Sequence, residues 1–214
     1  RHLRVSRAGN TVKSITSTLN KRSDKMFDED IKIADFGSNK KSADGEQRTQ
    51  RSSAAYEEYD RENTKGNTLK AKNLGTELAD DVVKNLDRFT AGSEEAENSD
   101  IALQRGILMT FAAITVIEND IDSSVVSQIA ENNFNSELEK TAPQLYKSVG
   151  DSGAFSFYYL AYRRGSEVDR RIGQTFAMLC SHDGDPVYQE LGEAIYCWFL
   201  SHARKKLEGV GFVK

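Results

Sequence analysis

Residues 107–117, with the sequence ILMTFAAITVI, form the most apolar stretch of the chain and are interrupted only by Thr110 and Thr115. Ser99, upstream of this stretch, is a residue type that favours the N-cap of a helix. The apolar residues between them recur at helical spacing around a broad face: Leu103, Ile107, Leu108, Phe111, Ile114 and Ile117. Such a face is typical of a helix buried at the centre of a domain. We therefore predict a central core helix here.

Helical apolar periodicity continues on both sides of this segment. Alternation typical of a β-strand is found only at residues 30–36. The expected helix starts are Thr76, Ser99, Asp122 or Ser123, Pro143, and Asp185 followed by Pro186. The first of these helices is expected to end near Gly92, Phe134 and Leu138 indicate a separate short helix, and Gly209 closes the last one. We predict an all-α core of about six to seven helices at residues 76–209, with residues 210–214 as the start of a C-terminal tail.

Residues 1–75 differ from this core in composition. The segment 40–73 is nearly free of large apolar residues, so it cannot bury a core of its own. The first 25 residues carry seven Lys or Arg against one Asp. We expect a long extended N-terminal arm held by other copies of the chain, although a solvated basic tail is an equally good interpretation of its beginning.

Residues 32–37, KIADFG, contain the DFG sequence with which protein kinases bind magnesium. No H-R-D loop, glycine-rich phosphate loop or A-P-E sequence accompanies it, so we reject a kinase. We expect instead that Ile31, Ile33 and Phe36 dock the arm on a neighbouring subunit.

Other catalytic and metal-binding constellations are not evident. The three histidines, His2, His182 and His202, lie on unrelated segments, and the loop of His182 to Asp185 lacks the further acids of a calcium site. No nucleophile elbow, P-loop or zinc-type cysteine pair occurs. We therefore expect no enzyme activity, no cofactor and no metal. Cys180 and Cys197 lie in apolar helical patterns, which predicts two buried, reduced thiols.

The stretch Ala154 to Arg171 has the sequence AFSFYYLAYRRGSEVDRR. It consists of an aromatic helix followed by an arginine-rich corner. Gly165 is expected to end one helix, and Ser166 to cap the next with Asp169 in an approximate capping box. Four arginines surround this corner: Arg163, Arg164, Arg170 and Arg171. The last two oppose the dipole of the second helix, an arrangement that suits a bound anion. Alternatively, Glu167 and Asp169 pair with these arginines on a solvated corner.

The net charge of −4 and the sequence pI of about 5.5 argue against a uniformly basic, sequence-blind nucleic-acid surface. They do not exclude RNA held in a local groove. The chain has no apolar run of the roughly 18 residues needed to span a membrane, so no membrane partner is expected.

The sequence Ala154 to Leu160, followed by Arg163, resembles the A-F-D-F-Y-x-L-x-x-R signature of potyvirus-type coat proteins, which form flexible filamentous plant viruses. Val116 to Asn119 is similar to the I-E-N segment of that family. The resemblance covers about a tenth of the chain. It implies an all-helical core, arms that dock on neighbouring subunits, and a groove for single-stranded RNA.

Residue by residue, the resemblance places Arg163 on the arginine of the motif. Ser156 stands where the family has an acidic residue of its RNA pocket, and Ser123 and Ser124 lie roughly where it has a pocket serine. We therefore expect a coat (nucleocapsid) protein, found in the virion and in the host cytoplasm, that packages single-stranded RNA into a helical filament of identical subunits. The alternative is a non-viral helical adaptor whose polar arm folds on a partner.

Overall fold

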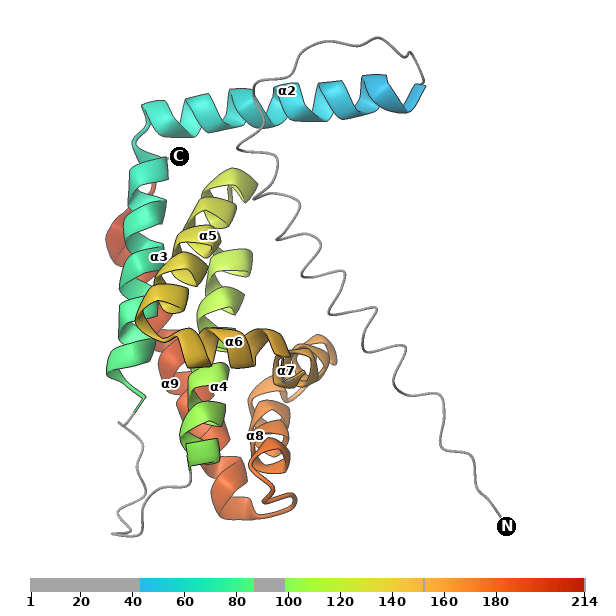
Figure 1. The fold of residues 1–214 in the computed structure, drawn as a ribbon, viewed down its shortest axis with the longest axis vertical. Coiled ribbons are helices and arrows are strands. Elements are labelled where there is room, and N and C mark those ends of the chain that lie inside the picture. Colours follow the sequence, from blue (N-terminus) through green and yellow to red (C-terminus); the bar gives the residue numbers. More distant parts are fainter. Residues whose placement is uncertain (1–42, 87–98, 152, 214) are drawn as a thin grey trace. The chain divides into compact units, whose positions relative to one another are not determined.

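The computed structural model describes residues 43–86, 99–151 and 153–213. The chain divides into residues 1–50 and residues 51–214, and the second unit contains the described core. Figure 1 shows the helices, which are α2 (Ala43–Thr64), α3 (Asn67–Lys84), α4 (Ser99–Asp120), α5 (Ser124–Thr141), α6 (Pro143–Asp151), α7 (Ala154–Arg163), α8 (Val168–Leu179) and α9 (Pro186–Val210). Within the described residues there is no strand, which confirms the all-α prediction for that part of the chain.

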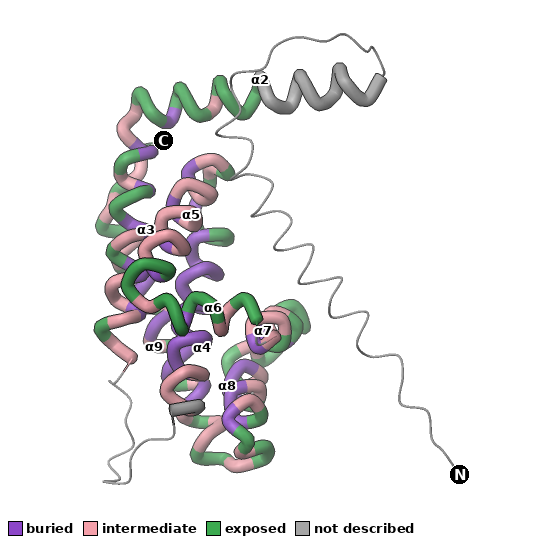
Figure 2. The backbone as a smooth tube through the Cα atoms, viewed as in Figure 1, coloured by how far each residue is buried: buried purple, intermediate pink, exposed green. Residues whose placement is uncertain are grey.

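Helix α4 is the centre of the unit, as its sequence predicts. Every residue from Arg105 to Ile117 is buried, and α4 packs on α3, α5, α6, α7, α8 and α9. Its buried positions form the purple segment inside the bundle in Figure 2. Residues Ile101–Asp120 have the length and composition of a membrane span, but 72% of that window is buried by the rest of the protein. The contacts of α4 therefore explain its apolar composition as that of a core helix.

Phe111 of α4 holds α7 and α9 against the core. The centroid of its ring lies 5.2 Å from that of Phe155, 5.6 Å from Tyr158 and 6.2 Å from Tyr162, all on α7. The ring of Tyr196 on α9 lies 6.4 Å away. Aromatic rings at such distances add to the stabilisation from burial alone. This cluster fixes the side of α7 that faces the core, and so the side that faces solvent.

The first core helix begins at Asn67, so the predicted start at Thr76 is wrong, and so is the boundary that placed residues up to 75 in an extended arm. Residues 43–64 form helix α2, and Ala71, Leu74 and Gly75 of α3 are buried. A Cβ atom on Gly75 would lie 2.2 Å from the carbonyl oxygen of Ala130 on α5. This buried stripe consists largely of small residues, so it lacked an apolar signal in the sequence. The extended conformation predicted for residues 1–42 lies outside the described residues, as do Ile31, Ile33 and Phe36.

Three further boundaries differ from expectation. Helix α3 ends at Lys84, with Asn85 as its C-cap, and not near Gly92. Phe134 and Leu138 belong to the single continuous helix α5, in which both are buried on the same face as Ala130. Helix α9 continues past Gly209 to Val210, and its C-cap is Gly211 with φ of 58°. The starts at Ser123 and at Asp185 with Pro186 are confirmed, because each cap side chain accepts a backbone N–H of the first turn.

Candidate nucleic-acid interface

Helix α7 has one buried side and one exposed side. Gly153 precedes it with φ of 69°, a left-handed conformation that glycine adopts without strain. Ala154, Tyr158 and Ala161 are buried, whereas Phe157 and Leu160 are about half exposed. Ser156 lies in the first turn, half-buried, and its backbone N–H donates to the carbonyl of Gly153. The helix therefore presents a partly apolar face that leads toward the arginines at its C-terminal end.

Arg163 and Arg164 are exposed and have no carboxylate partner among the described residues. The guanidinium carbon of Arg163 lies 5.7 Å from the centroid of the Tyr159 ring, within the range of a cation–π contact. Gly165 follows with φ of 81° and ends the helix as predicted. Two unneutralised cations thus project beside a helix end.

Arg170 and Arg171 are engaged locally. Arg170 forms an exposed ion pair with Glu167, with an Nη1 to Oε1 distance of 3.6 Å. Arg171 donates through Nη2 to Ser166 Oγ at 3.1 Å, while its Nη1 is buried without a hydrogen-bond partner. Exposed pairs of this kind contribute little to stability and exchange readily. Arg170 can therefore still turn to an anion, whereas Arg171 is half-buried.

Ser166, the predicted N-cap of α8, does not occupy that position, so this prediction is wrong. The N-cap position is taken by Glu167, with φ of 49°, and Ser166 instead accepts the hydrogen bond from Arg171. Asp169 turns toward α9, where its carboxylate interacts with the thiol of Cys197. Only one of the two acids expected to neutralise the corner, Glu167, therefore pairs with an arginine. The structure leaves the corner with a surplus of positive charge.

Both cysteines are free thiols, as predicted, but only Cys180 is buried. Cys197 is exposed, so its predicted burial is wrong: it lies on the outer side of α9. Partial desolvation and the carboxylate of Asp169 raise the pKa of the Cys197 thiol to about 11. A thiol with such a pKa is a weak nucleophile at neutral pH.

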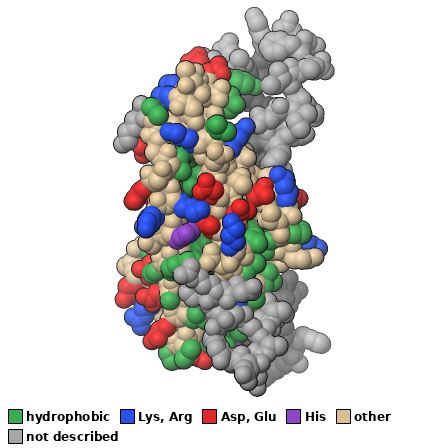
Figure 3. Space-filling view, turned by 90° about the vertical axis from the view of Figure 1, so that its left-hand side faces the viewer, with side chains coloured by type: hydrophobic (Ala, Val, Ile, Leu, Met, Phe, Trp, Pro, Cys, Tyr) green, Lys and Arg blue, Asp and Glu red, His purple; other side chains and the backbone are tan. Residues whose placement is uncertain are grey.

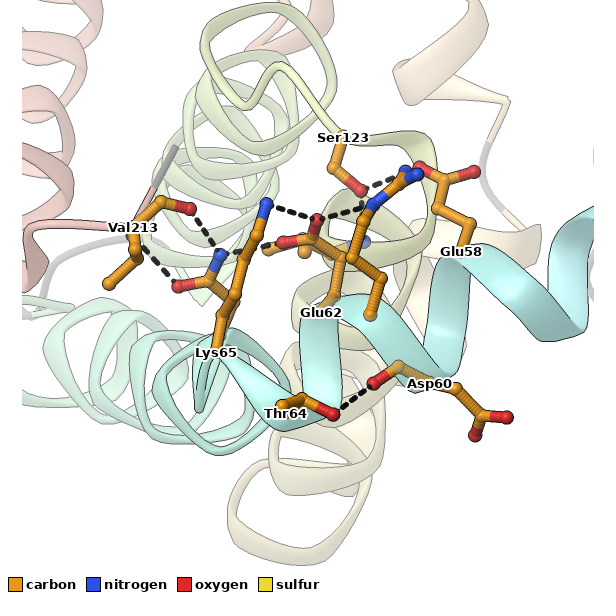
Figure 4. Close-up of polar contacts among 10 residues, drawn as sticks. Glu58, Asp60, Glu62, Thr64, Lys65, Ser123 and Val213 are labelled. Carbon is orange, nitrogen blue, oxygen red and sulfur yellow. Dashed lines mark hydrogen bonds and ion pairs between the residues drawn. The ribbon is translucent and has the colours of Figure 1, made fainter.

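Ser123 and Ser124 lie at the link between α4 and α5, at the end of the unit where α2 meets α3, and thus apart from the arginine corner (Figure 1). Ser123 Oγ accepts the N–H of Val126 at 3.3 Å and donates to Glu58 of α2 at 2.8 Å, a contact drawn in Figure 4. Ser124 is exposed. The structure shows a helix-capping role for Ser123, and the RNA contacts expected of both serines stay predictions.

A polar cluster at the α2–α3 junction was not found by sequence reasoning. The Glu62 carboxylate is buried and accepts from Asn67 Nδ2 at 2.6 Å and from Lys65 Nζ at 3.1 Å (Figure 4). These hydrogen bonds, that of Asn67 first, hold the pKa of Glu62 below its usual value. Asn67 also bonds both the N–H and the carbonyl of Val213, at 2.9 and 2.8 Å. This cluster attaches the C-terminal segment to the α2–α3 junction.

The α2–α3 junction, the α4–α5 link and the end of α9 line a pocket of about 740 Å³. Its cations are already neutralised: Lys65 pairs with Glu62, and Arg204 lies 2.8 Å from Asp120. On the neighbouring α3–α9 face, Lys206 lies 2.7 Å from Asp81, which also contacts His202 at 2.8 Å. Figure 3 shows basic and acidic side chains interspersed on the side of the molecule that carries α3. Exposed lysines without a carboxylate partner among the described residues also occur on α3 and α9, such as Lys72 and Lys205, whereas the arginine corner places two adjacent unpaired guanidinium groups at one helix end.

A metal centre has no support from the described side chains, because nowhere in residues 54–86, 101–151 and 153–213 do three His, Cys, Asp or Glu converge. His182 instead stacks on Tyr188, with ring centroids 3.7 Å apart. No protein-family model, curated protein or solved structure matches the chain.

Proposed function

We propose that this protein is a structural, self-assembling subunit that coats single-stranded RNA as a helical filament, in the virion and in the host cytoplasm. The observation that carries the proposal is the exposed corner at Arg163 and Arg164, where two guanidinium groups have no carboxylate partner among the described residues. Arg170 and Arg171 stand in the first turn of the next helix, beside backbone N–H groups. Guanidinium and N–H donors together suit phosphate oxygens.

The arginine corner also fits a packaging protein, because its guanidinium groups suit phosphates, which every nucleotide carries. Phosphate contacts through arginine are independent of sequence, and a coat must accept every part of a genome. The net charge of −4 restricts the positive charge to a local site, so RNA is bound where subunits align their corners rather than over the whole surface. The resemblance of Ala154 to Arg163 to the coat-protein signature supports the same proposal.

One observation favours the second candidate, a helical adaptor. Helix α2 carries two exposed tyrosines at i, i+3 spacing, Tyr56 at 59% and Tyr59 at 40% exposure. Exposed aromatic side chains on one helix face are typical of protein-binding surfaces. An adaptor would bind its partner without RNA and would form no filament. Electron micrographs of the purified chain mixed with RNA separate the two functions.

The test of the RNA site is an Arg163→Ala variant. Each lost phosphate contact removes one released counterion, so the slope of log affinity against log salt should fall by about 0.7, the value for single strands. The loss should be the same for unrelated RNA sequences. Binding is measured by fluorescence anisotropy at several salt concentrations.

The matched control is Lys72→Ala, because Lys72 is an exposed cation on α3, across the bundle from α7 (Figure 1). The control should leave affinity and salt slope unchanged. The free energy of unfolding of both variants should lie within about 1 kcal/mol of that of the parent, since exposed charges contribute little to stability. Equal affinities and equal salt slopes for Arg163→Ala and the parent would show that the corner is a solvated cluster of charges and does not bind RNA.

A further inference from the structure

We propose that Phe157 on the exposed face of α7 is a base-stacking platform, so that the site binds nucleobases as well as phosphates. This inference rests on the proposed RNA-coating function and adds a residue that the coat-protein resemblance does not assign. It concerns unpaired bases, because only a single strand offers a free base face to a side chain.

Phe157 stands apart from the other aromatic residues of its helix. Phe155, Tyr158 and Tyr162 all turn toward the ring of Phe111 in the core. Phe157 makes no ring contact among the described residues and is 47% exposed. Leaving a phenylalanine half in water forgoes much of the stabilisation that its burial would provide. An exposed aromatic residue of this kind, next to buried ones, indicates a surface that something covers.

The face around Phe157 joins it to Arg164, one of the two arginines without a carboxylate partner among the described residues. Residues 157, 160 and 164 follow i, i+3, i+7 spacing and therefore lie along one side of the helix. At 1.5 Å rise per residue, Phe157 and Arg164 are separated by about 10 Å along the axis. Leu160, at 53% exposure, lies between them. The ring and the guanidinium are thus placed to serve neighbouring nucleotides of one strand.

The charge of this face favours RNA over a second protein as its occupant. A protein surface that covered Phe157 and Leu160 would also bring Arg163 and Arg164 into an interface, where an unpaired cation is costly to desolvate. A single-stranded nucleic acid supplies both parts at once: a base to stack on the ring and a phosphate for each guanidinium. No acidic residue lies between Phe157 and Arg164 in the sequence to repel the strand.

The experiment compares two oligonucleotides of equal length and charge, oligouridine and an abasic strand, for binding to the full chain. Phe157→Ala should weaken oligouridine binding roughly five- to a hundredfold, the range of one lost base stack, and leave abasic binding unchanged. Phe157→Trp should restore oligouridine binding. Arg163→Ala should instead weaken both oligonucleotides by the same factor.

Leu160→Ala is the matched control, because it removes an exposed apolar side chain of the same face that has no π system. It should change the ratio of oligouridine to abasic affinity less than twofold. If Phe157→Ala left the ratio of the two affinities unchanged, the stacking role would be overturned. It would also be overturned if Phe157→Ala prevented self-assembly in the absence of RNA, because Phe157 would then belong to a contact between subunits. If the parent bound neither oligonucleotide, the proposed function itself would fail, which is a distinct result.

Discussion

At the scale of single residues, Glu131 shows how the fold alters a side chain that looks ordinary in the sequence. Glu131 is half-buried on α5, and the carboxylate of Glu118 on α4 faces it. Desolvation, and then repulsion from Glu118, raises the pKa of Glu131 to about 7. The folded protein therefore holds a proton that the unfolded chain, with a carboxyl pKa near 4.5, releases at a lower pH.

This residue makes the free energy of unfolding dependent on pH. Below about pH 4.5 the carboxyl is protonated in both states, and its neutral form is accommodated. As pH rises toward 7, the unfolded state loses its proton first, so stability falls, and it levels off above pH 7. Glu131→Gln should remove this loss and be more stable than the parent at pH 8, by on the order of 2 kcal/mol.

Chemical denaturation at pH 5 and pH 8 measures the effect. Glu139→Gln, at an exposed position on the same helix, is the control and should shift the midpoint little at either pH. A stabilisation by Glu131→Gln that is equal at both pH values would show that the cause is not titration.

At the scale of elements, close helix contacts depend on glycines whose role is visible only in three dimensions. Gly173 of α8 faces α9, where an added Cβ atom would lie 2.3 Å from the carbonyl oxygen of Gln189. Gly192 of α9 is opposed by the side chain of Phe176 in the same way. Because these neighbours are backbone or core atoms, α8 and α9 would have to separate to accept a methyl group.

Gly173→Ala should therefore destabilise the protein by about 1–3 kcal/mol through overpacking, despite the better helix propensity of alanine. Gly209→Ala in the last turn of α9 is the control, because nothing lies within 4 Å of its added Cβ atom. That variant should be neutral or more stable by up to about 1 kcal/mol. Thermal unfolding of both proteins tests the pair; equal melting temperatures would mean that the α8–α9 contact adjusts freely.

At the scale of the whole molecule, the proposed filament depends on contacts between copies. The segment containing Ile31, Ile33 and Phe36 lies outside the described residues, and its docking on a neighbouring subunit stays a prediction. Ile33→Asp should abolish filaments while leaving the unfolding transition of the helical unit unchanged, since an aspartate is costly to bury in an apolar interface.

Ser38→Asp introduces the same charge at a neighbouring polar position and should assemble normally. Electron microscopy and sedimentation in the presence of RNA distinguish filaments from monomers. If Ile33→Asp instead lowered the stability of the isolated subunit, these residues would belong to its own core, and the assembly proposal would lose its main support.

Local signals in the sequence predicted much of the core. The helical class, the central position of α4, and the starts at Ser123 and at Asp185 with Pro186 depend on periodicity and on caps within one turn. The arginine corner was also predicted, because Arg163, Arg164, Arg170 and Arg171 flank a glycine that ends a helix. These features require no knowledge of distant parts of the chain.

The tertiary structure alone decided the remaining features, because each depends on partners far away in the sequence. Asn67 and Gly75 belong to the buried part of α3 only because Val213 and Ala130 complete their surroundings. Likewise, Asp169 interacts with Cys197 on α9 and not with the arginines. Phe157 is exposed because Phe111 packs against the opposite side of α7. The apolar pattern of a sequence indicates that a residue is suited to burial, whereas packing between helices determines which residues are buried and which charges remain unpaired.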